Sequence, residues 1–165
     1  MRAGLILLGL AAAVFSAAAA PSAIDRLTGG YHERLDGKFS DGRPYTSRRD
    51  LEVLRLDGTA AFFRTEIVYP NQHTCGLSGI AALEGSALVY RTRDGPKLCT
   101  LTITARGDKV VLNDAGSCND YCGAAASFDG IAFQASRRKP ISDPNRLLKS
   151  RDYATAVAER KKGGH

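Results

Sequence analysis

The sequence predicts an all-β protein, an antiparallel up-and-down meander of about eight or nine strands that closes into a small barrel or half-barrel. Three observations support this class. Apolar and polar residues alternate over short segments, Asp-Gly pairs recur between those segments, and four cysteines follow an apolar N-terminal run. A two-sheet sandwich is the alternative architecture. A short, basic, helical tail is expected after the last strand.

The N-terminal segment, residues 1–19, has the pattern of a secretory signal peptide. Arg2 supplies a positive charge, Leu5–Phe15 is an apolar run of eleven residues, and a stretch of small residues follows. Cleavage after Ala18 or Ala19 fits best. We therefore expect an exported protein, either periplasmic or secreted. The apolar run is shorter than the about 20 residues that span a bilayer, and no second long run follows, so no transmembrane segment is expected.

Residues 20–135 are predicted to form a disulfide-stabilised β domain. In Cys99–Ala105, apolar residues and threonines alternate with the period of two expected of a half-buried strand. Ala61–Tyr69 and Cys75–Leu83 alternate in the same way, although Phe62 makes the second face of its segment partly apolar. The shorter candidate strands are Tyr31–Leu35, Arg48–Leu56, Ala87–Thr92, Lys109–Asn113, Gly123–Phe128 and Ile131–Ala135.

Turn residues separate these segments at short intervals. Asp and Gly both tolerate the positive φ that two-residue hairpin turns require, so an Asp-Gly pair between alternating segments predicts a hairpin. Closely spaced hairpins favour a meander, because antiparallel neighbours need only a tight turn between them. The pairs are Asp36-Gly37, Asp41-Gly42, Asp57-Gly58, Asp94-Gly95 and Asp129-Gly130, and Glu84-Gly85 and Gly107-Asp108 are expected to act similarly.

The character of the chain changes after Ala135. Residues 136–165 contain nine basic and three acidic residues, a net charge of +6, whereas the preceding β domain is nearly neutral. Asp143 followed by Pro144 predicts a helix start, and a longer helix is expected over Arg151–Lys162. This tail either packs on the barrel or forms a loose, solvated end. Its basic end suits an anionic envelope surface, and nucleic acid is not expected as a partner of an exported protein. The candidate residues for this contact are Arg160, Lys161 and Lys162.

An even number of cysteines in an exported chain of this size predicts two disulfides. Four cysteines allow three pairings, and spacing alone does not choose among them. Counting residues along the strands from the predicted turns at Glu84-Gly85 and Gly107-Asp108 places all four sulfurs near one end of the sheet. We slightly prefer Cys75–Cys99 with Cys118–Cys122, and the alternative is Cys99–Cys118 with Cys75–Cys122.

The densest polar segment is Asp114–Gly123, which we interpret as a disulfide-pinned loop. A pre-ordered loop loses little entropy on binding, so it could present a recognition surface to a protein partner. The alternative is a structural loop whose polar side chains satisfy turn backbone. No EF-hand spacing supports a calcium site, and we expect neither a metal nor a cofactor. The candidate binding residues are Asp114, Asn119, Asp120 and Tyr121.

No residue pattern indicates catalysis strongly. Ser78 lies in Gly-x-Ser-x-Ile, which lacks the final Gly of a hydrolase nucleophile motif, and a β meander does not supply the strand-to-helix elbow that the motif needs. His73 and Cys75 are too far apart along a strand for a catalytic dyad. Three histidines without ligand spacing do not suggest a zinc site. Whether the protein is an enzyme is open, and a binding protein is the favoured interpretation.

An exported, two-disulfide, antiparallel barrel of this size resembles the small periplasmic inhibitors of C-type lysozyme from Gram-negative bacteria, over residues 29–135. Those proteins carry a Ser-Gly-x-x-Tyr loop that enters the lysozyme cleft. Here Ser78-Gly79 is followed by Ile80 and Ala81, and Ala82 stands where the Tyr would be. The resemblance implies inhibition of a secreted hydrolase such as lysozyme. The leading expectation is an exported, non-catalytic binding module of the bacterial cell envelope, and the further alternative is a hydrolase of a cell-envelope polymer.

Overall fold

The computed structural model describes residues 22–94 and 97–163 of the chain. Eight antiparallel strands follow one another in a single sheet, in the order of the sequence, and form a nearly closed barrel with a short C-terminal helical region. The predicted all-β meander is therefore confirmed. The signal peptide predicted at residues 1–19 lies outside the described residues. The elements are α1 (Ala23–Leu27), β1 (Gly29–Lys38), β2 (Pro44–Arg55), β3 (Ala60–Val68), β4 (Thr74–Glu84), β5 (Ala87–Asp94), β6 (Lys97–Arg106), β7 (Lys109–Asn113), η1 (Asn119–Tyr121), β8 (Ala132–Gln134), η2 (Ala135–Arg137), α2 (Pro144–Leu148) and α3 (Arg151–Gly163).

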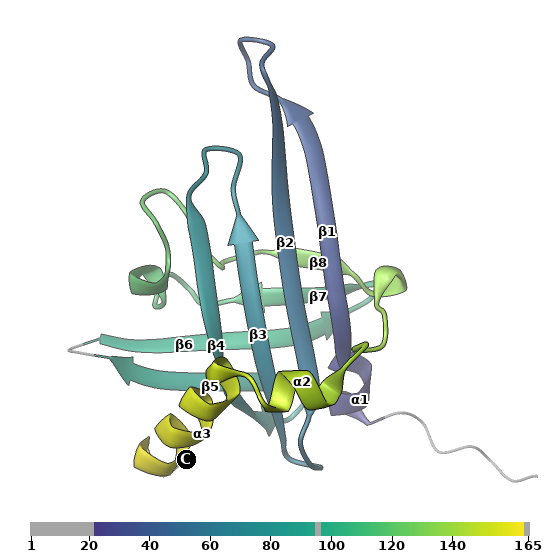
Figure 1. The fold of residues 1–165 in the computed structure, drawn as a ribbon, viewed down its shortest axis with the longest axis vertical. Helices are drawn as coiled ribbons and strands as arrows, with labels where there is room; N and C mark the ends of the chain where they lie inside the picture. The colour runs from purple at the N-terminus through teal and green to yellow at the C-terminus, as the bar shows by residue number, and fades with distance from the viewer. Residues whose placement is uncertain (1–21, 95–96, 164–165) are drawn as a thin grey trace, which may run out of the picture.

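The sheet consists of two halves that cross steeply (Figure 1). Strands β1 to β4 run along the long axis of the molecule, and β5 to β8 run across them behind. The halves join at a corner where β4 and β5 pair over only three residues, Ala82–Glu84 with Ala87–Val89. Beyond this corner the strands diverge, so side chains from both halves can fill the space between them.

Aromatic side chains from the two halves meet in the main core. Tyr31 of β1 packs on Phe133 of β8, with ring centroids 5.9 Å apart, and Phe63 of β3 packs edge-on against Tyr90 of β5 at 5.2 Å. Gly79 of β4 makes room for this arrangement, because a Cβ atom there would lie 2.2 Å from the Tyr90 ring. All four aromatic side chains are buried, which ties the two halves together.

The barrel closes where β1 approaches β8. Gly30 and Lys139 exchange two backbone hydrogen bonds of 2.8 and 2.9 Å. A little further along β1, the buried carboxylate of Glu33 accepts the backbone N–H of Gln134 at 2.9 Å. At this point of the seam a side-chain carboxylate, rather than a backbone carbonyl of a neighbouring strand, accepts the hydrogen bond. Among the described residues, no strand pairs with the rest of the outer edge of β1.

The C-terminal tail packs against the outer face of the sheet. Of the two alternatives left by the sequence, a packed tail and a loose, solvated end, the first is therefore correct. Phe62 points outward from β3 and is buried beneath Leu147 of α2 and Ala156 of α3. Tyr153 of α3 meets the Phe62 ring edge-on at 5.3 Å. The apolar second face of β3 is therefore explained by the helices that cover it. None of the helices within the described ranges is long and apolar enough to cross a membrane.

Two expectations of local structure are wrong. The segment Gly123–Phe128 is a loop rather than a strand, and the hydroxyl of Tyr69 donates a hydrogen bond to the carbonyl of Ser127 within it. Asp36-Gly37 lies inside β1, because the hairpin turn comes later, where the N–H of Phe39 bonds the carbonyl of Arg43 at 2.9 Å. The β1–β2 hairpin therefore projects further from the barrel than the sequence indicated (Figure 1).

All four cysteines form disulfides, as predicted, but the preferred pairing is wrong. The bonds are Cys75–Cys122 and Cys99–Cys118, the alternative map. Cys75 lies on β4 and Cys99 on β6, which are not neighbours because β5 lies between them. The 3-10 turn η1 separates Cys118 from Cys122, so that each bonds a different strand. Together the two disulfides fasten one loop to both crossing halves of the sheet.

Candidate functional site

The disulfide-pinned loop places its predicted binding residues in different environments. Asp114 is only 3% exposed, and its carboxylate accepts the backbone N–H groups of Gly116 at 3.3 Å and Cys118 at 3.1 Å. The Ser117 hydroxyl accepts the N–H of Thr100 at 3.0 Å and so fastens the loop to β6. The carboxylate of Asp114 is therefore buried and holds the loop conformation from within.

The other three candidates lie on the turn η1. Asn119 and Asp120 are exposed, and Tyr121 is half-buried against the main core. The disulfides at Cys118 and Cys122 bracket this turn and fix its position on the molecule. A role in partner recognition for the exposed pair stays a prediction. Within the described ranges, no cluster of three or more His, Cys, Asp or Glu side chains has a geometry that could hold a metal ion.

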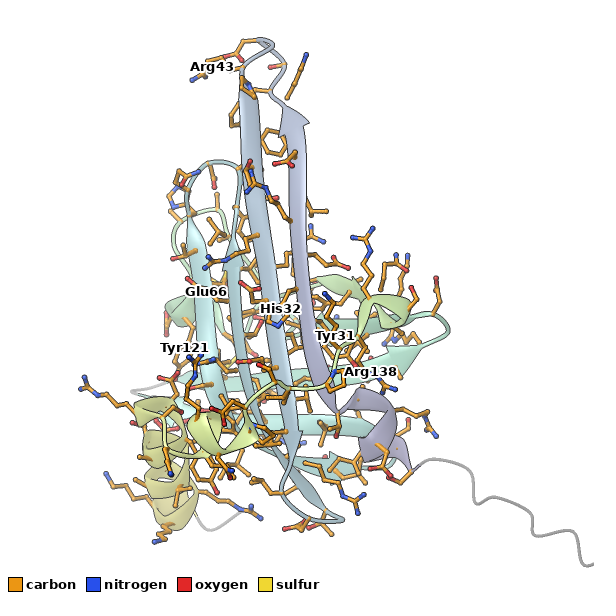
Figure 2. The ribbon with its side chains drawn as sticks, turned by 45° about the vertical axis from the view of Figure 1, so that its right-hand side comes forward. Tyr31, His32, Arg43, Glu66, Tyr121 and Arg138 are labelled. Atoms are coloured by element: carbon orange, nitrogen blue, oxygen red, sulfur yellow. A yellow bond between two sulfur atoms is a disulfide. The ribbon has the colours of Figure 1, made fainter. Side chains whose placement is uncertain are left out.

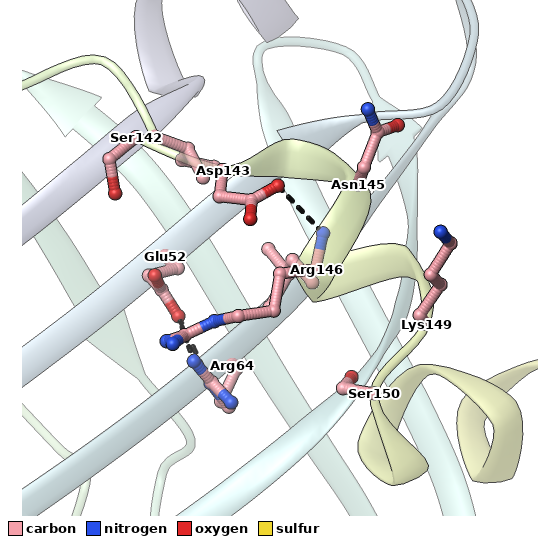
Figure 3. A pocket seen from close by; sticks show the side chains of 10 residues that line it. Glu52, Arg64, Ser142, Asp143, Asn145, Arg146, Lys149 and Ser150 are labelled. Carbon is pink, nitrogen blue, oxygen red and sulfur yellow. Dashed lines mark hydrogen bonds and ion pairs between the residues drawn. The ribbon is translucent and has the colours of Figure 1, made fainter.

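A pocket of about 590 Å³ lies beside the sheet, between its outer face and the helical tail (Figure 3). Strands β2 and β3 form its floor, and α2 with the turn into α3 forms its wall. We call this pocket the tail groove. Three cationic and two anionic side chains line it, together with polar and apolar neighbours. The lining residues are Glu52, Arg64, Ile141, Ser142, Asp143, Asn145, Arg146, Leu147, Lys149 and Ser150.

The floor of the tail groove carries a guanidinium that is fixed in place. Glu52 and Arg64 are cross-strand partners of β2 and β3, and one carboxylate oxygen of Glu52 accepts bonds from Arg64 Nε at 3.0 Å and Nη2 at 2.5 Å. Asp152 of α3 contacts Arg64 Nη1 at 3.4 Å. Burial acts to lower the pKa of Arg64, but the hydrogen bonds and charges of Glu52 and Asp152 outweigh it and raise the pKa. The group is therefore a permanent, oriented cation.

The wall of the tail groove contributes a second guanidinium. Asp143 is the N-cap of α2, and its carboxylate accepts the backbone N–H of Arg146 at 2.9 Å, which fixes the first turn of the helix. Figure 3 shows the Arg146 side chain extending from α2 toward Glu52 and Arg64. Among residues 22–94 and 97–163, no carboxylate lies within 4.0 Å ion-pair distance of the Arg146 guanidinium.

The position of α2 follows from packing. Leu147 is buried against Phe62 on the outer face of β3, which turns the neighbouring Arg146 and Lys149 to the groove side and to solvent. The N-cap of α3 is Ser150, whose hydroxyl accepts the N–H of Tyr153 at 3.2 Å. Apolar contacts and caps thus hold two short helices firmly enough to define one side of a pocket.

A polar ladder continues across the outer face of the sheet from the tail groove (Figure 2). His32 Nδ1 lies 2.8 Å from Asp50, and Arg48 contacts both Asp50 at 2.7 Å and Glu66 at 2.8 Å. Next to it, a smaller hollow of about 370 Å³ includes Glu66 and the half-buried Ser78. Ser78 lies in the middle of β4, without the strand-to-helix elbow that a nucleophile motif needs.

No protein-family model, curated protein or solved structure matches this chain. The resemblance to the inhibitors of C-type lysozyme therefore stays a prediction. The protein is an antiparallel β-barrel with two disulfides. Between its sheet and its C-terminal helices lies a groove lined by two arginines.

Sequence reasoning missed the tail groove. It counted Arg146 and Lys149 only as part of the basic tail and did not single out Arg64. One signal was present in the sequence, because the outward-facing Phe62 indicated that some element covers the second face of its strand. Nothing in the sequence indicated which helix would do so.

Proposed function

We propose that the protein is an exported, non-catalytic binding module of the bacterial cell envelope that binds an anionic ligand in the tail groove. The observation that carries this proposal is the pair of guanidinium groups that converge there. Arg64 is fixed by two carboxylates, and Arg146 extends toward it without an acidic partner among the described residues. Guanidinium groups bind carboxylate and phosphate oxygens through two parallel hydrogen bonds, so the ligand is expected to carry such a group.

Charge near the tail groove supports an anionic ligand. Arg64, Arg146 and Lys149 line the groove, where Glu52, Asp143 and the neighbouring Asp152 offset them, and the tail from residue 136 carries a net charge of +6. The exposed basic end of α3, Arg160 to Lys162, extends the positive field beyond the pocket. Such a field attracts an anionic envelope component before specific contacts form.

The hydrogen bonding of the groove supports binding over hydrolysis. A polymer hydrolase of the glycosidase type needs two carboxylates that face one another across the scissile bond. Here Glu52 accepts hydrogen bonds from Arg64, and Asp143 accepts the backbone N–H that starts α2. Both lining acids are therefore engaged in holding the site together.

Calorimetric titration tests the proposal, with inorganic pyrophosphate and succinate as separate probes for phosphate and carboxylate chemistry. The wild-type protein should bind at least one of them, and binding should weaken as salt is raised. Arg146→Glu should abolish the signal without lowering the melting temperature, because Arg146 is exposed and its guanidinium makes no ion pair among the described residues. Arg137→Glu, an equal charge change at an exposed position outside the groove, is the matched control and should retain binding.

Vesicles of phosphatidylglycerol test whether the basic end of α3 helps to hold the protein on an anionic surface. Deleting residues 151–165 would uncover Phe62, so a triple Glu variant of Arg160, Lys161 and Lys162 is the better probe. It should lose salt-sensitive binding to these vesicles while keeping its thermal stability. No binding by the wild type to either soluble anion or to the vesicles would overturn the proposal.

A further inference from the structure

The outer edge of β1 is a second candidate interaction surface, separate from the tail groove. β1 is the first strand of the sheet. Among the described residues the backbone of its outer edge is paired only at Gly30, with Lys139, and the side chain of Glu33 accepts the N–H of Gln134. The N-terminal half of β1 lies near the barrel seam, but the half toward Lys38 projects beyond the crossing strands with β2 (Figure 1). An unpaired edge of this length is a ready template for another strand.

The direction of the backbone groups along this edge follows from the contact at Gly30. Because the N–H and C=O of Gly30 bond Lys139, they point away from β2. Backbone direction alternates along an antiparallel strand, so the even-numbered residues from His32 to Lys38 share this outward direction. The odd-numbered residues should point toward β2 instead. Phe39 agrees with this, because its N–H bonds the carbonyl of Arg43, on the β2 side of the hairpin.

The side chains at the outward-pointing positions alternate in charge. Arg34 and Asp36 are exposed, with side-chain exposures of 73% and 64%, and Lys38 is exposed as well. Arg34 Nε contacts its neighbour Asp36 at 3.3 Å on the same face of the strand. Thr46 of β2 joins the pair, because its hydroxyl donates to Asp36 at 2.6 Å and accepts from Arg34 at 3.3 Å. An exposed pair of this kind contributes little to the stability of a single chain, and both side chains keep an exposed side that a partner can contact.

We propose that two copies of this chain pair through their β1 edges, antiparallel about a two-fold axis that passes beside Leu35. This register sets Arg34 of one copy opposite Asp36 of the other, and the two-fold axis repeats the contact. Four pairs of outward-pointing residues then face each other, and each pair can exchange two backbone hydrogen bonds. Such a contact is isologous, as expected of a homodimer.

The charges select this register over its neighbours. A shift of the two-fold axis to Arg34 sets Arg34 opposite its own copy, and a shift to Asp36 sets Asp36 opposite its own copy. Like charges directly opposite each other destabilise a strand pair. In the proposed register the outermost pair is Lys38 opposite His32, whose ring is bound by the Asp50 carboxylate at 2.8 Å. The partner is therefore a second copy of the chain, recognised by its own pattern of alternating charge.

Sedimentation equilibrium with charge-reversed variants tests this pairing. The wild-type protein should show reversible dimerisation that weakens as salt is raised. Arg34→Asp and Asp36→Arg should each weaken the dimer about tenfold or more, because each turns two attractive cross-strand pairs into repulsive ones. An equimolar mixture of the two variants should dimerise again, since one chain then presents two acids and the other two arginines.

Arg106→Asp, the same charge change at an exposed position of β6, is the control and should dimerise as the wild type does. A wild-type protein that stays monomeric at the highest soluble concentration would overturn the pairing. So would a dimer that neither reversal weakens, or a mixture of the two variants that fails to associate. Neither reversal touches the tail groove, so this result is independent of the proposed anion binding.

Discussion

Removing the two disulfides one at a time should lower stability by different amounts, because they close loops of different length. The two variants are Cys75→Ala/Cys122→Ala and Cys99→Ala/Cys118→Ala. Alanine is used because three of the four cysteines are buried and it adds no polar group to these sites. The first disulfide joins residues 47 apart in sequence and the second joins residues 19 apart. Loss of either bond lets the unfolded chain explore more conformations.

Chain entropy gives the size of each effect. A separation of 47 residues corresponds to about 4 kcal/mol at 25 °C, and a separation of 19 residues to about 3 kcal/mol. A domain of this size has a total unfolding free energy of about 5–15 kcal/mol, so either loss is a large fraction of it. We expect both variants to fold, with the Cys75–Cys122 variant the less stable of the two.

Guanidinium unfolding followed by far-ultraviolet circular dichroism measures these free energies directly. Digestion of the unreduced wild-type protein with chymotrypsin complements it, because cleavage after Tyr121 separates Cys118 from Cys122. The expected fragments link Cys75 to Cys122 and Cys99 to Cys118. A Cys118–Cys122 peptide, or a variant order opposite to the loop lengths, would refute the reasoning.

Substitutions at three further positions test separate parts of the fold. Gly79→Ala should lower the unfolding free energy by about 1–3 kcal/mol in a denaturant titration, because the new methyl group meets the Tyr90 ring; unchanged stability would contradict the packing described. Glu33→Leu should cost about 1–3 kcal/mol by leaving the Gln134 N–H without an acceptor at the barrel seam, whereas Glu33→Gln, which keeps an acceptor oxygen, should cost less; equal losses would speak against this hydrogen bond. Hydrogen bonds from the backbone and hydroxyl of Thr59 lower the pKa of Asp57 below its ordinary value of 3.8, so its charged form stabilises the fold above that pH and this contribution is lost as the pH falls through the lowered pKa. Melting curves from neutral pH to about pH 3 should show the stability advantage of wild type over Asp57→Asn shrinking on acidification, and a constant difference would contradict the assignment.

The strand order could be predicted from the sequence because it depends on local signals. Alternation over Cys75–Leu83 and Cys99–Ala105 marks half-buried strands, and turns at Asp57-Gly58 and Glu84-Gly85 connect neighbours. The helix over Arg151–Lys162 was also predictable, because Ser150 is a favourable capping residue and apolar residues follow it at helical spacing. Each of these features is decided by residues close together in the chain.

The disulfide pairing was not predictable because it depends on where the sheet bends. Counting residues from the predicted turns assumes that β4 and β5 stay paired along their length, whereas they separate after three residues. Cys75 therefore never faces β5. It meets Cys122 across an isolated bridge instead. The same bend lets the Tyr90 ring pack directly against Gly79. No local sequence pattern indicates this contact.

The tail groove was not predictable for a related reason. Its two arginines come from β3 and α2, and they meet only because Leu147 and Ala156 dock on Phe62. The sequence instead indicated the loop Asp114–Gly123, because polar residues are densest there. In that loop, the carboxylate of Asp114 accepts hydrogen bonds from the backbone. Composition alone does not distinguish such a buried structural residue from an exposed binding residue.

Chemical-shift mapping of an anion onto the backbone amides tests the central proposal most directly. Pyrophosphate titrated into isotope-labelled protein should shift the amide signals of Asn145 to Ser150 and of Arg64, with saturation, and Arg146→Glu should remove these shifts. The amides of Asn119 and Asp120, in the disulfide-pinned loop outside the groove lining, should stay unchanged. Saturable shifts confined to that loop, or an Arg146→Glu variant that responds as the wild type does, would contradict the account.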